Sequence, residues 1–232
     1  MAGLLLAACT AGPLFRPDTY TVRRGDTLYS IAWRYGVDWR RLARWNGIGP
    51  PYDIYPGDVL HLDGRTRSVA SSTSSSSSSA PSGGASRDGG QRTARASSPA
   101  PRDRPAPMAS DLDWRWPVGG KVLRGYSGSH ARRGIDIAGS MGDAVRAAAP
   151  GRVVYSGSGL KGYGNLVIIK HDDRFLSAYG FNRRLRVGQG ETVGAGQHIA
   201  DVGLGPENRA MLYFEIRRDG EPVDPQRLLP RR

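Results

Sequence analysis

Cysteine, histidine and long apolar runs are scarce in this sequence, and each shortage limits what the protein can be. The 232 residues include one cysteine and four histidines. A single cysteine excludes an internal disulfide, so the fold must rest on its apolar cores. No apolar run approaches the roughly 20 residues that a membrane-spanning helix needs. Four histidines also leave few candidates for a metal site.

Acidic residues are outnumbered by basic ones. The chain has 33 Lys and Arg against 21 Asp and Glu, which gives a net charge of +12 and an isoelectric point near 10.4. Most of this excess lies beyond residue 63. Such a balance predicts an anionic polymer as partner. Nucleic acid is one candidate, but no nucleic-acid-binding motif accompanies the charge, so we expect no nucleic-acid partner.

Changes in composition divide the chain. Residues 64–110 consist mainly of Ser, Ala, Pro, Gly and Arg, and they lack the apolar side chains that would offset the entropy cost of folding. We expect a disordered linker, with ends on the order of 40 Å apart if it behaves as a flexible chain. It would separate a domain at 19–63 from a domain at 111–232, and these domains are expected to move independently. Residues 1–18 form an amino-terminal tether.

The amino terminus resembles the lipobox of bacterial lipoproteins. Leu-Ala-Ala-Cys stands at residues 6–9, and the resemblance implies that Cys9 becomes the lipid-carrying first residue of the mature protein. The alternative is a free cysteine buried in an apolar segment, but nothing downstream would enclose it. The apolar stretch has only about six residues against about 7–15 in a signal peptide, and a start further upstream would supply the rest. Thr10, in place of Asp, implies a lipid anchor in the outer membrane.

Hydrophobic patterns in the first domain predict the order strand, helix, helix, strand. Residues 20–22 and 59–62 have the alternation of short strands. Apolar residues at i, i+3, i+4 and i+7 from Leu28 form one face of a helix, and Thr27 is its N-cap candidate. Asp38 can cap a second helix.

The same segment resembles a LysM domain. Its signatures are Tyr-x-Val-x-x-Gly-Asp-Thr-Leu, which begins at Tyr20, and Ile-Tyr-Pro-Gly-Asp-Val-Leu, which begins at Ile54. The resemblance implies a small βααβ fold that binds N-acetylglucosamine-containing glycan through Gly25, Asp26, Thr27 and Ile54. Asp26 and Thr27 also have the simpler role of shaping the turn and capping the helix. Three tryptophans at helical spacing are expected in the core rather than as sugar-stacking platforms: Trp33, Trp39 and Trp45.

The carboxy-terminal domain is predicted to be mainly antiparallel β structure. Its candidate strands are short, rich in β-branched or aromatic residues, and separated by Asp-Asp or Gly-rich turns. They lie at residues 151–155, 165–170, 175–179 and 212–217. A domain of about 120 residues is large enough for a core of its own.

Five blocks of this domain, in order, resemble the lysostaphin/LytM family of zinc metallopeptidases. They are Gly-Ile-Asp-Ile-Ala at 134–138, Gly-Arg-Val-Val at 151–154, Gly-Tyr-Gly-Asn at 162–165, Gly-Gln at 196–197 and Leu-Tyr-Phe-Glu at 212–215. The resemblance implies a duplicated-hybrid-motif-like β fold. In that family a His and an Asp of the first motif, with the second His of a His-x-His pair, hold zinc. Two further histidines act on the water or the transition state.

Only one of those functional positions keeps its residue in this chain. The first ligand falls on Arg132, the Asp ligand on Asp136, and the histidine of the Tyr-x-His motif on Phe181; the His-x-His pair falls on Met211 and Tyr213. A catalytic zinc needs about three protein ligands with lone pairs. A guanidinium has none and opposes a dication. We therefore expect no metal, no cofactor and no peptidase activity, with Arg132 and Asp136 able to pair instead.

None of the four histidines is expected to replace a lost zinc ligand. His130 lies near the first motif but two residues out of place, so a surface-loop residue is expected. His171 is expected to end a strand, hydrogen-bonded near the groove floor, rather than to act in catalysis. His61 and His198 have no second ligand at metal spacing.

A lipobox, a LysM domain and a degenerate LytM domain together resemble the NlpD type of murein hydrolase activator. The resemblance implies an envelope lipoprotein on the periplasmic face of the outer membrane. It would bind peptidoglycan, whose carboxylates suit the basic charge, and activate an N-acetylmuramoyl-L-alanine amidase during cell separation. The amidase contact is expected in a groove better suited to gripping a peptide or helix than to hydrolysis: Arg132, Asp136, Phe181, Met211 and Tyr213.

Two other functions fit the same domains. A passive tether between the outer membrane and the wall predicts peptidoglycan binding with no effect on any hydrolase. An active zinc endopeptidase predicts stoichiometric zinc in the purified domain.

Overall fold

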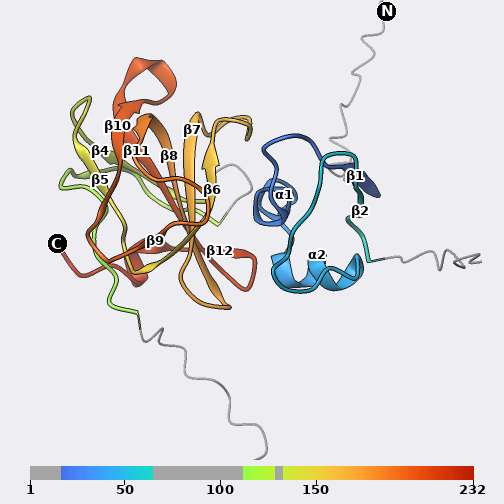
Figure 1. Ribbon diagram of the computed structural model, residues 1–232. Helices are drawn as coiled ribbons and strands as arrows, with labels where there is room; N and C mark the ends of the chain where they lie inside the picture. Colours follow the sequence, from blue (N-terminus) through green and yellow to red (C-terminus); the bar gives the residue numbers. More distant parts are fainter. Residues whose placement is uncertain (1–16, 65–111, 129–132) are drawn as a thin grey trace, which may run out of the picture. The chain divides into compact units, whose positions relative to one another are not determined.

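A computed structural model describes residues 17–64, 112–128 and 133–232 (Figure 1). The predicted lipidation residue Cys9, the predicted linker, and His130 and Arg132 lie outside the described residues. None of the described helices is long and apolar enough to cross a membrane.

The first domain has the predicted βααβ order. Strands β1 (Thr19–Thr21) and β2 (Val59–His61) pair antiparallel, and helices α1 (Leu28–Tyr35) and α2 (Trp39–Trp45) lie between them in sequence. Thr27 caps α1 as predicted, because its side chain accepts from the Ser30 amide at 3.0 Å.

The second helix of this domain also begins at its predicted cap. The Asp38 carboxylate accepts from the Arg41 amide at 3.0 Å. Trp33 and Trp39 are 1% and 3% exposed and Trp45 is half-buried, in agreement with the predicted core role of these rings.

The second domain is mainly antiparallel β structure, as predicted. Its strands are β3 (Val122–Arg124), β4 (Ile135–Ala138), β5 (Ala144–Arg146), β6 (Gly151–Gly157), β7 (Asn165–Lys170), β8 (Phe175–Leu185), β9 (Thr192–Val193), β10 (His198–Leu204), β11 (Ala210–Arg218) and β12 (Glu221–Val223). The sheet has the order β3-β4-β11-β10-β8-β7-β6-β9, and β11 also pairs with β8. Two short 3-10 helices, Pro206–Asn208 and Pro225–Arg227, flank β11 and β12.

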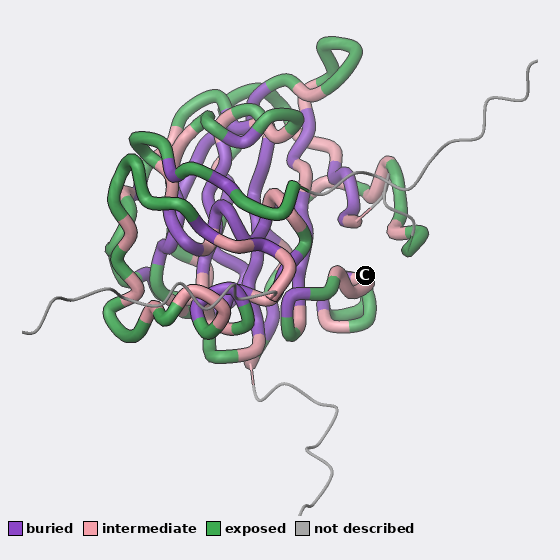
Figure 2. The backbone as a smooth tube through the Cα atoms, turned by 90° about the vertical axis from the view of Figure 1, so that its right-hand side faces the viewer, coloured by how far each residue is buried: buried purple, intermediate pink, exposed green. Residues whose placement is uncertain are grey.

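Strand β7 is buried on both faces. Leu166, Val167, Ile168 and Ile169 are all fully buried, although successive side chains of a strand point to opposite sides. Val167 and Ile169 belong to the core inside the second domain, which includes Phe214. Figure 2 shows the central strands of the sheet as buried. A strand covered on both faces has a continuous apolar run instead of alternation, as residues 166–169 do.

The outer cover of β7 comes from the first domain. Leu166 and Ile168 share one apolar cluster with Ile31 and Trp33 of α1. Residues 17–64 and the described residues from 112 onward accordingly form one compact unit. Each domain contributes apolar side chains to a common core, and this packing differs from the expectation that the two domains move independently.

Candidate functional site

Sheet register brings most of the predicted groove together. Asp136 of β4 lies opposite Tyr213 of β11, and Tyr213 lies opposite Gly180 of β8. Phe181 follows Gly180, and Met211 lies two residues before Tyr213 on the same side of β11. Four of the five predicted residues thus meet across three neighbouring strands, and the fifth, Arg132, lies outside the described residues.

Asp136 has a partner that sequence analysis did not single out. Its carboxylate is nearly buried and forms an ion pair with Arg124, whose Nε donates to one carboxylate oxygen and whose Nη2 lies close to the same oxygen. Arg124 reaches Asp136 because β3 and β4 are adjacent and the two residues are in register, whereas Arg132, the pairing residue that the sequence suggests, lies outside the described residues. A guanidinium cannot ligate a metal, so this contact neutralises the carboxylate instead.

Three aromatic rings form the other side of this region. The Tyr213 ring centroid lies 5.5 Å from that of Tyr163 and 6.2 Å from that of Phe181. Phe181 has a φ of 59°, a conformation that L-residues with large side chains rarely adopt. The Phe181 amide donates to the Tyr163 carbonyl at 2.7 Å, which helps to hold this backbone turn.

Two adjoining cavities define what we call the groove. The first cavity has a volume of about 340 Å³ and is lined by the three aromatic rings. The second has a volume of about 220 Å³ and is lined by Asp136 and Met211 among others. Arg124 and Pro206 line both. The full lining is Leu123, Arg124, Arg133, Asp136, Gly162, Tyr163, Phe181, Pro206, Glu207, Arg209, Met211 and Tyr213.

A chain of polar contacts runs from the groove to helix α1. The Tyr213 hydroxyl donates to Glu215 at 2.6 Å, and Arg217 Nε donates to the other Glu215 oxygen at 2.6 Å. Arg217 Nη1 also donates to the Trp33 carbonyl at 3.0 Å, and its guanidinium lies 3.7 Å from the Trp33 ring centroid. Burial, together with the Glu215 carboxylate, raises the pKa of Tyr213 far above its usual range, so this phenol acts as a neutral donor.

Among the described residues, no group of three or more His, Cys, Asp and Glu side chains is placed to hold a metal ion. His171 follows β7, as expected, and its ring contacts the Pro150 carbonyl and the Ser177 hydroxyl, each at 2.7 Å. His198 contacts Asp201 at 2.7 Å. These rings have structural partners, in agreement with the expectation for His171.

Three of the four predicted glycan-binding residues line a cavity of about 510 Å³. Asp26, Thr27 and Ile54 line it, whereas Gly25 does not. The Asp26 carboxylate is held by the Tyr20 hydroxyl at 2.6 Å and the Arg23 amide at 2.9 Å. Tyr29 and Tyr52 stand beside these residues in the cavity wall; sequence analysis missed both, although their aromatic character in or next to the two signature loops was the available signal.

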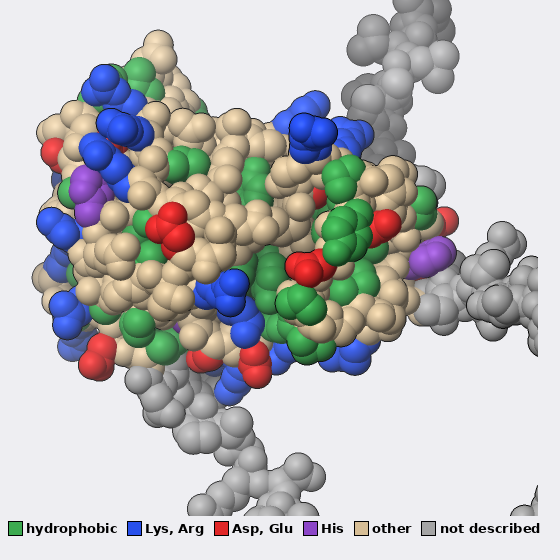
Figure 3. Space-filling model, viewed as in Figure 1, with side chains coloured by type: hydrophobic (Ala, Val, Ile, Leu, Met, Phe, Trp, Pro, Cys, Tyr) green, Lys and Arg blue, Asp and Glu red, His purple; other side chains and the backbone are tan. Residues whose placement is uncertain are grey.

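On one face of the molecule, basic residues are interspersed with acidic ones (Figure 3). Figure 3 shows Lys and Arg side chains in separate groups on the visible face, with acidic side chains among them. A nucleic-acid-binding surface would gather its positive charge in one patch or stripe.

Comparison with known families assigns both domains. The model of the LysM domain matches residues 20–63, and the model of peptidase family M23 matches residues 130–225.

Several proteins resemble this chain over most of its length. A lipoprotein NlpD/LppB homolog from Pseudomonas aeruginosa is 44% identical over 242 residues, covering 92% of this chain and 77% of that protein. The murein hydrolase activator NlpD of Escherichia coli is 37% identical over 259 residues, covering 93% of this chain and 68% of that protein. An uncharacterized lipoprotein of the same organism, YgeR, is 38% identical and covers 98% of this chain and 89% of its own length.

Proposed function

Because this chain belongs to the NlpD family of lipoproteins, we propose that it activates an N-acetylmuramoyl-L-alanine amidase and cuts no peptidoglycan itself. Relatives that bear the name murein hydrolase activator support a role in the activation of wall hydrolysis.

The ion pair between Arg124 and Asp136 carries the proposal. In a zinc peptidase the carboxylate at this position would serve the metal; here a guanidinium occupies it. Metal-assisted hydrolysis needs a cation that polarises the carbonyl and lowers the pKa of bound water. Phe181, Met211 and Tyr213 stand where the zinc peptidases have histidines, and none of the three is a usual zinc ligand. We infer that the groove binds a partner and does not hydrolyse an amide.

The remaining groove has the composition of a binding surface. Aromatic side chains and arginines are the residues most often found at the energetic centres of protein interfaces. Tyr163, Phe181 and Tyr213 provide the aromatic area, and Arg124 and Arg133 provide the cations at the rim. We therefore assign the amidase contact to the groove. Arg132, which directly precedes the lining residue Arg133 in the sequence, is part of the same proposed contact.

The first domain would hold the protein on the wall. A LysM domain whose loop residues Asp26, Thr27 and Ile54 line a cavity supports binding of peptidoglycan glycan. Lipidation of Cys9 would anchor the chain on the periplasmic face of the outer membrane, in keeping with relatives named outer membrane lipoproteins. Activation of an amidase from that position would serve cell separation.

Release of dye-labelled peptidoglycan tests the proposal. The chain from residue 10 onward, the amidase of the same organism and the mixture are compared at equal protein concentration. Release above the amidase rate in the mixture alone is the expected result. Release by this chain alone would mean that it is a peptidase, and no gain in the mixture would leave a passive tether as the function.

Variants of the groove locate the contact. Phe181→Ala and Arg133→Glu are expected to abolish activation while wall binding persists. Arg183→Glu, an exposed arginine on β8 outside the groove, is the matched control and should activate normally. Full activation by both groove variants would contradict the assignment of the groove.

A further inference from the structure

The cavity at the glycan loops has a second wall that the LysM domain does not provide. Its lining includes Asp26 to Tyr29 and Pro51 to Ile54 from the first domain, and Arg152, Lys170 and His171 from the sheet. We propose that this cavity is a composite site for an acidic glycan, in which the loops hold N-acetylated sugars and Arg152 and Lys170 hold a carboxylate attached to them. The inference rests on the proposed wall binding and names the ligand class of that site.

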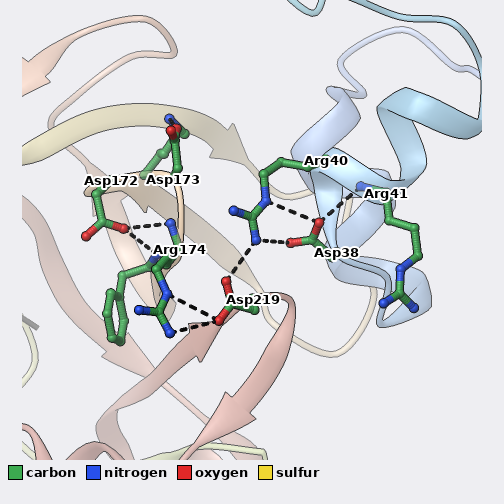
Figure 4. A network of polar contacts seen from close by, with 9 residues as sticks. Asp38, Arg40, Arg41, Asp172, Asp173, Arg174 and Asp219 are labelled. Atoms are coloured by element: carbon green, nitrogen blue, oxygen red, sulfur yellow. Dashed lines mark hydrogen bonds and ion pairs between the residues drawn. The ribbon is translucent and has the colours of Figure 1, made fainter. Parts of the chain in front are cut away.

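The two walls are held together by a packed interface. Arg217 of β11 donates to the Trp33 carbonyl, and Arg34 of α1 donates to the Gly159 carbonyl at 3.2 Å. Arg40 Nη2 lies 2.8 Å from Asp219, which also pairs with Arg174, as Figure 4 shows. These contacts join the first domain to the sheet on either side of the cavity.

The backbone of Gly220 in the second domain lies close to the backbone of Asp38 at the start of α2. A Cβ atom added at Gly220 would lie 2.6 Å from Asp38 Cα, and Gly220 has a φ of 85°. Only glycine meets both conditions without displacing the neighbouring backbone. The turn between β11 and β12 is thus shaped to admit the start of α2.

The first wall of the cavity is suited to sugars. Tyr29, Trp39 and Tyr52 form a run of rings, with centroids 4.9 Å and 5.0 Å apart. Tyr29 and Tyr52 reach the cavity and combine an apolar face with a hydroxyl. Burial raises the pKa of Tyr29 to about 12, so its hydroxyl is a neutral donor at physiological pH.

The second wall is cationic. Arg152 of β6 lies opposite Lys170 of β7 in the sheet register, which places both side chains at the same level of the sheet. Lys170 pairs with Asp173 at 2.8 Å and lies 5.1 Å from the Trp39 ring centroid. Arg152 is exposed and forms no ion pair with any described residue, so its guanidinium can accept a carboxylate in a two-point contact.

The exposed guanidinium of Arg152 favours a carboxylate over a neutral ligand. Two acidic residues, Asp26 and Asp53, belong to the first wall of the cavity; Asp26 is already engaged by Tyr20, Arg23 and Arg34, and Asp53 is exposed on the loop beside Ile54. A neutral chain of N-acetylglucosamine would contact the aromatic wall and leave Arg152 unused. A glycan carrying a lactyl carboxylate or a stem peptide would contact both walls, and a volume of about 510 Å³ is within the range of small-ligand sites.

Calorimetric titration of the chain from residue 10 onward tests the inference with three glycans of equal length. They are neutral chitotetraose, a peptidoglycan tetrasaccharide with free lactyl carboxylates, and the same tetrasaccharide with stem peptides. We expect at least one acidic glycan to bind about tenfold more tightly than chitotetraose, the effect of one charge-assisted hydrogen bond. The two acidic ligands identify which carboxylate is recognised.

Charge-reversal variants assign the preference to this wall. Arg152→Glu and Lys170→Glu should each remove the preference for the acidic glycan over chitotetraose. Arg183→Glu changes the net charge equally and should keep the preference. Equal affinity for neutral and acidic glycans, or a preference that survives both variants, overturns the composite site while wall binding stands. Failure of all three glycans to bind overturns the proposed wall binding as well.

Discussion

Asp136 and Arg124 illustrate how single residues decide the chemistry of the groove. The carboxylate is nearly buried, while the Arg124 side chain is 50% exposed, so the pair lies between a surface and a buried ion pair. Loss of the arginine would leave a nearly buried carboxylate without this ion pair.

We expect Arg124→Ala to lower the free energy of unfolding by about 1–3 kcal/mol, the cost of a buried polar group left unsatisfied. Urea denaturation followed by circular dichroism measures this change. Asp136→Asn in the Arg124→Ala background should recover part of the loss, because a neutral amide tolerates burial better than a carboxylate. A double variant no more stable than Arg124→Ala would show that the pair does not carry the effect.

His171 should make stability depend on pH. Burial lowers its pKa to about 4 from an unfolded value near 6.5, so the folded state binds the proton less readily than the unfolded chain. Its contribution to stability is therefore complete above pH 6.5 and falls as the pH decreases toward 4.

In His171→Gln, the slope of unfolding free energy between pH 4 and 6.5 should be smaller than in the unmodified chain. Because part of the ring reaches the glycan cavity and solvent, the difference should be less than the full shift implies. Denaturation midpoints at four pH values in this window provide the measurement, with His61→Gln as control. Identical slopes for His171→Gln and the unmodified chain would show that His171 does not cause the pH dependence of stability.

At the scale of elements, local sequence patterns predict where helices and strands lie, but they do not predict which strands pair. The caps at Thr27 and Asp38 and the strand at residues 165–170 follow from patterns within a few residues, and the structure confirms them. Arg124 and the left-handed turn at Phe181 depend on which strands become neighbours. Sheet register joins residues far apart in sequence, so no local pattern reveals it.

The cap of α1 gives a test at this scale. Thr27 and Ser30 satisfy each other's amides, so Thr27→Ala leaves the first turn of the helix without its side-chain acceptor. We expect a loss of about 1 kcal/mol in unfolding free energy, and near recovery in Thr27→Ser. Thermal unfolding without glycan measures the cap alone, separately from any sugar contact. Equal stability of the Ala and Ser variants would show that the cap contributes nothing.

For the whole molecule, the shared core predicts cooperative unfolding. Leu166 and Ile168 pack with Ile31 and Trp33, so neither domain can unfold without exposing apolar surface of the other. Calorimetry of the chain from residue 10 onward should show one transition, with equal van't Hoff and calorimetric enthalpies. Two separate transitions would mean that the domains are energetically independent, as composition alone had suggested.

The double-sided burial of β7 also bears on how such chains can diverge. A descendant that lost residues 17–64 would present Leu166 and Ile168 to water on neighbouring positions of a sheet, a surface prone to self-association. We therefore expect a descendant without residues 17–64 to carry polar substitutions at these positions. Strand β7 in this way links the sequence changes that each domain can accept to the presence of the other domain.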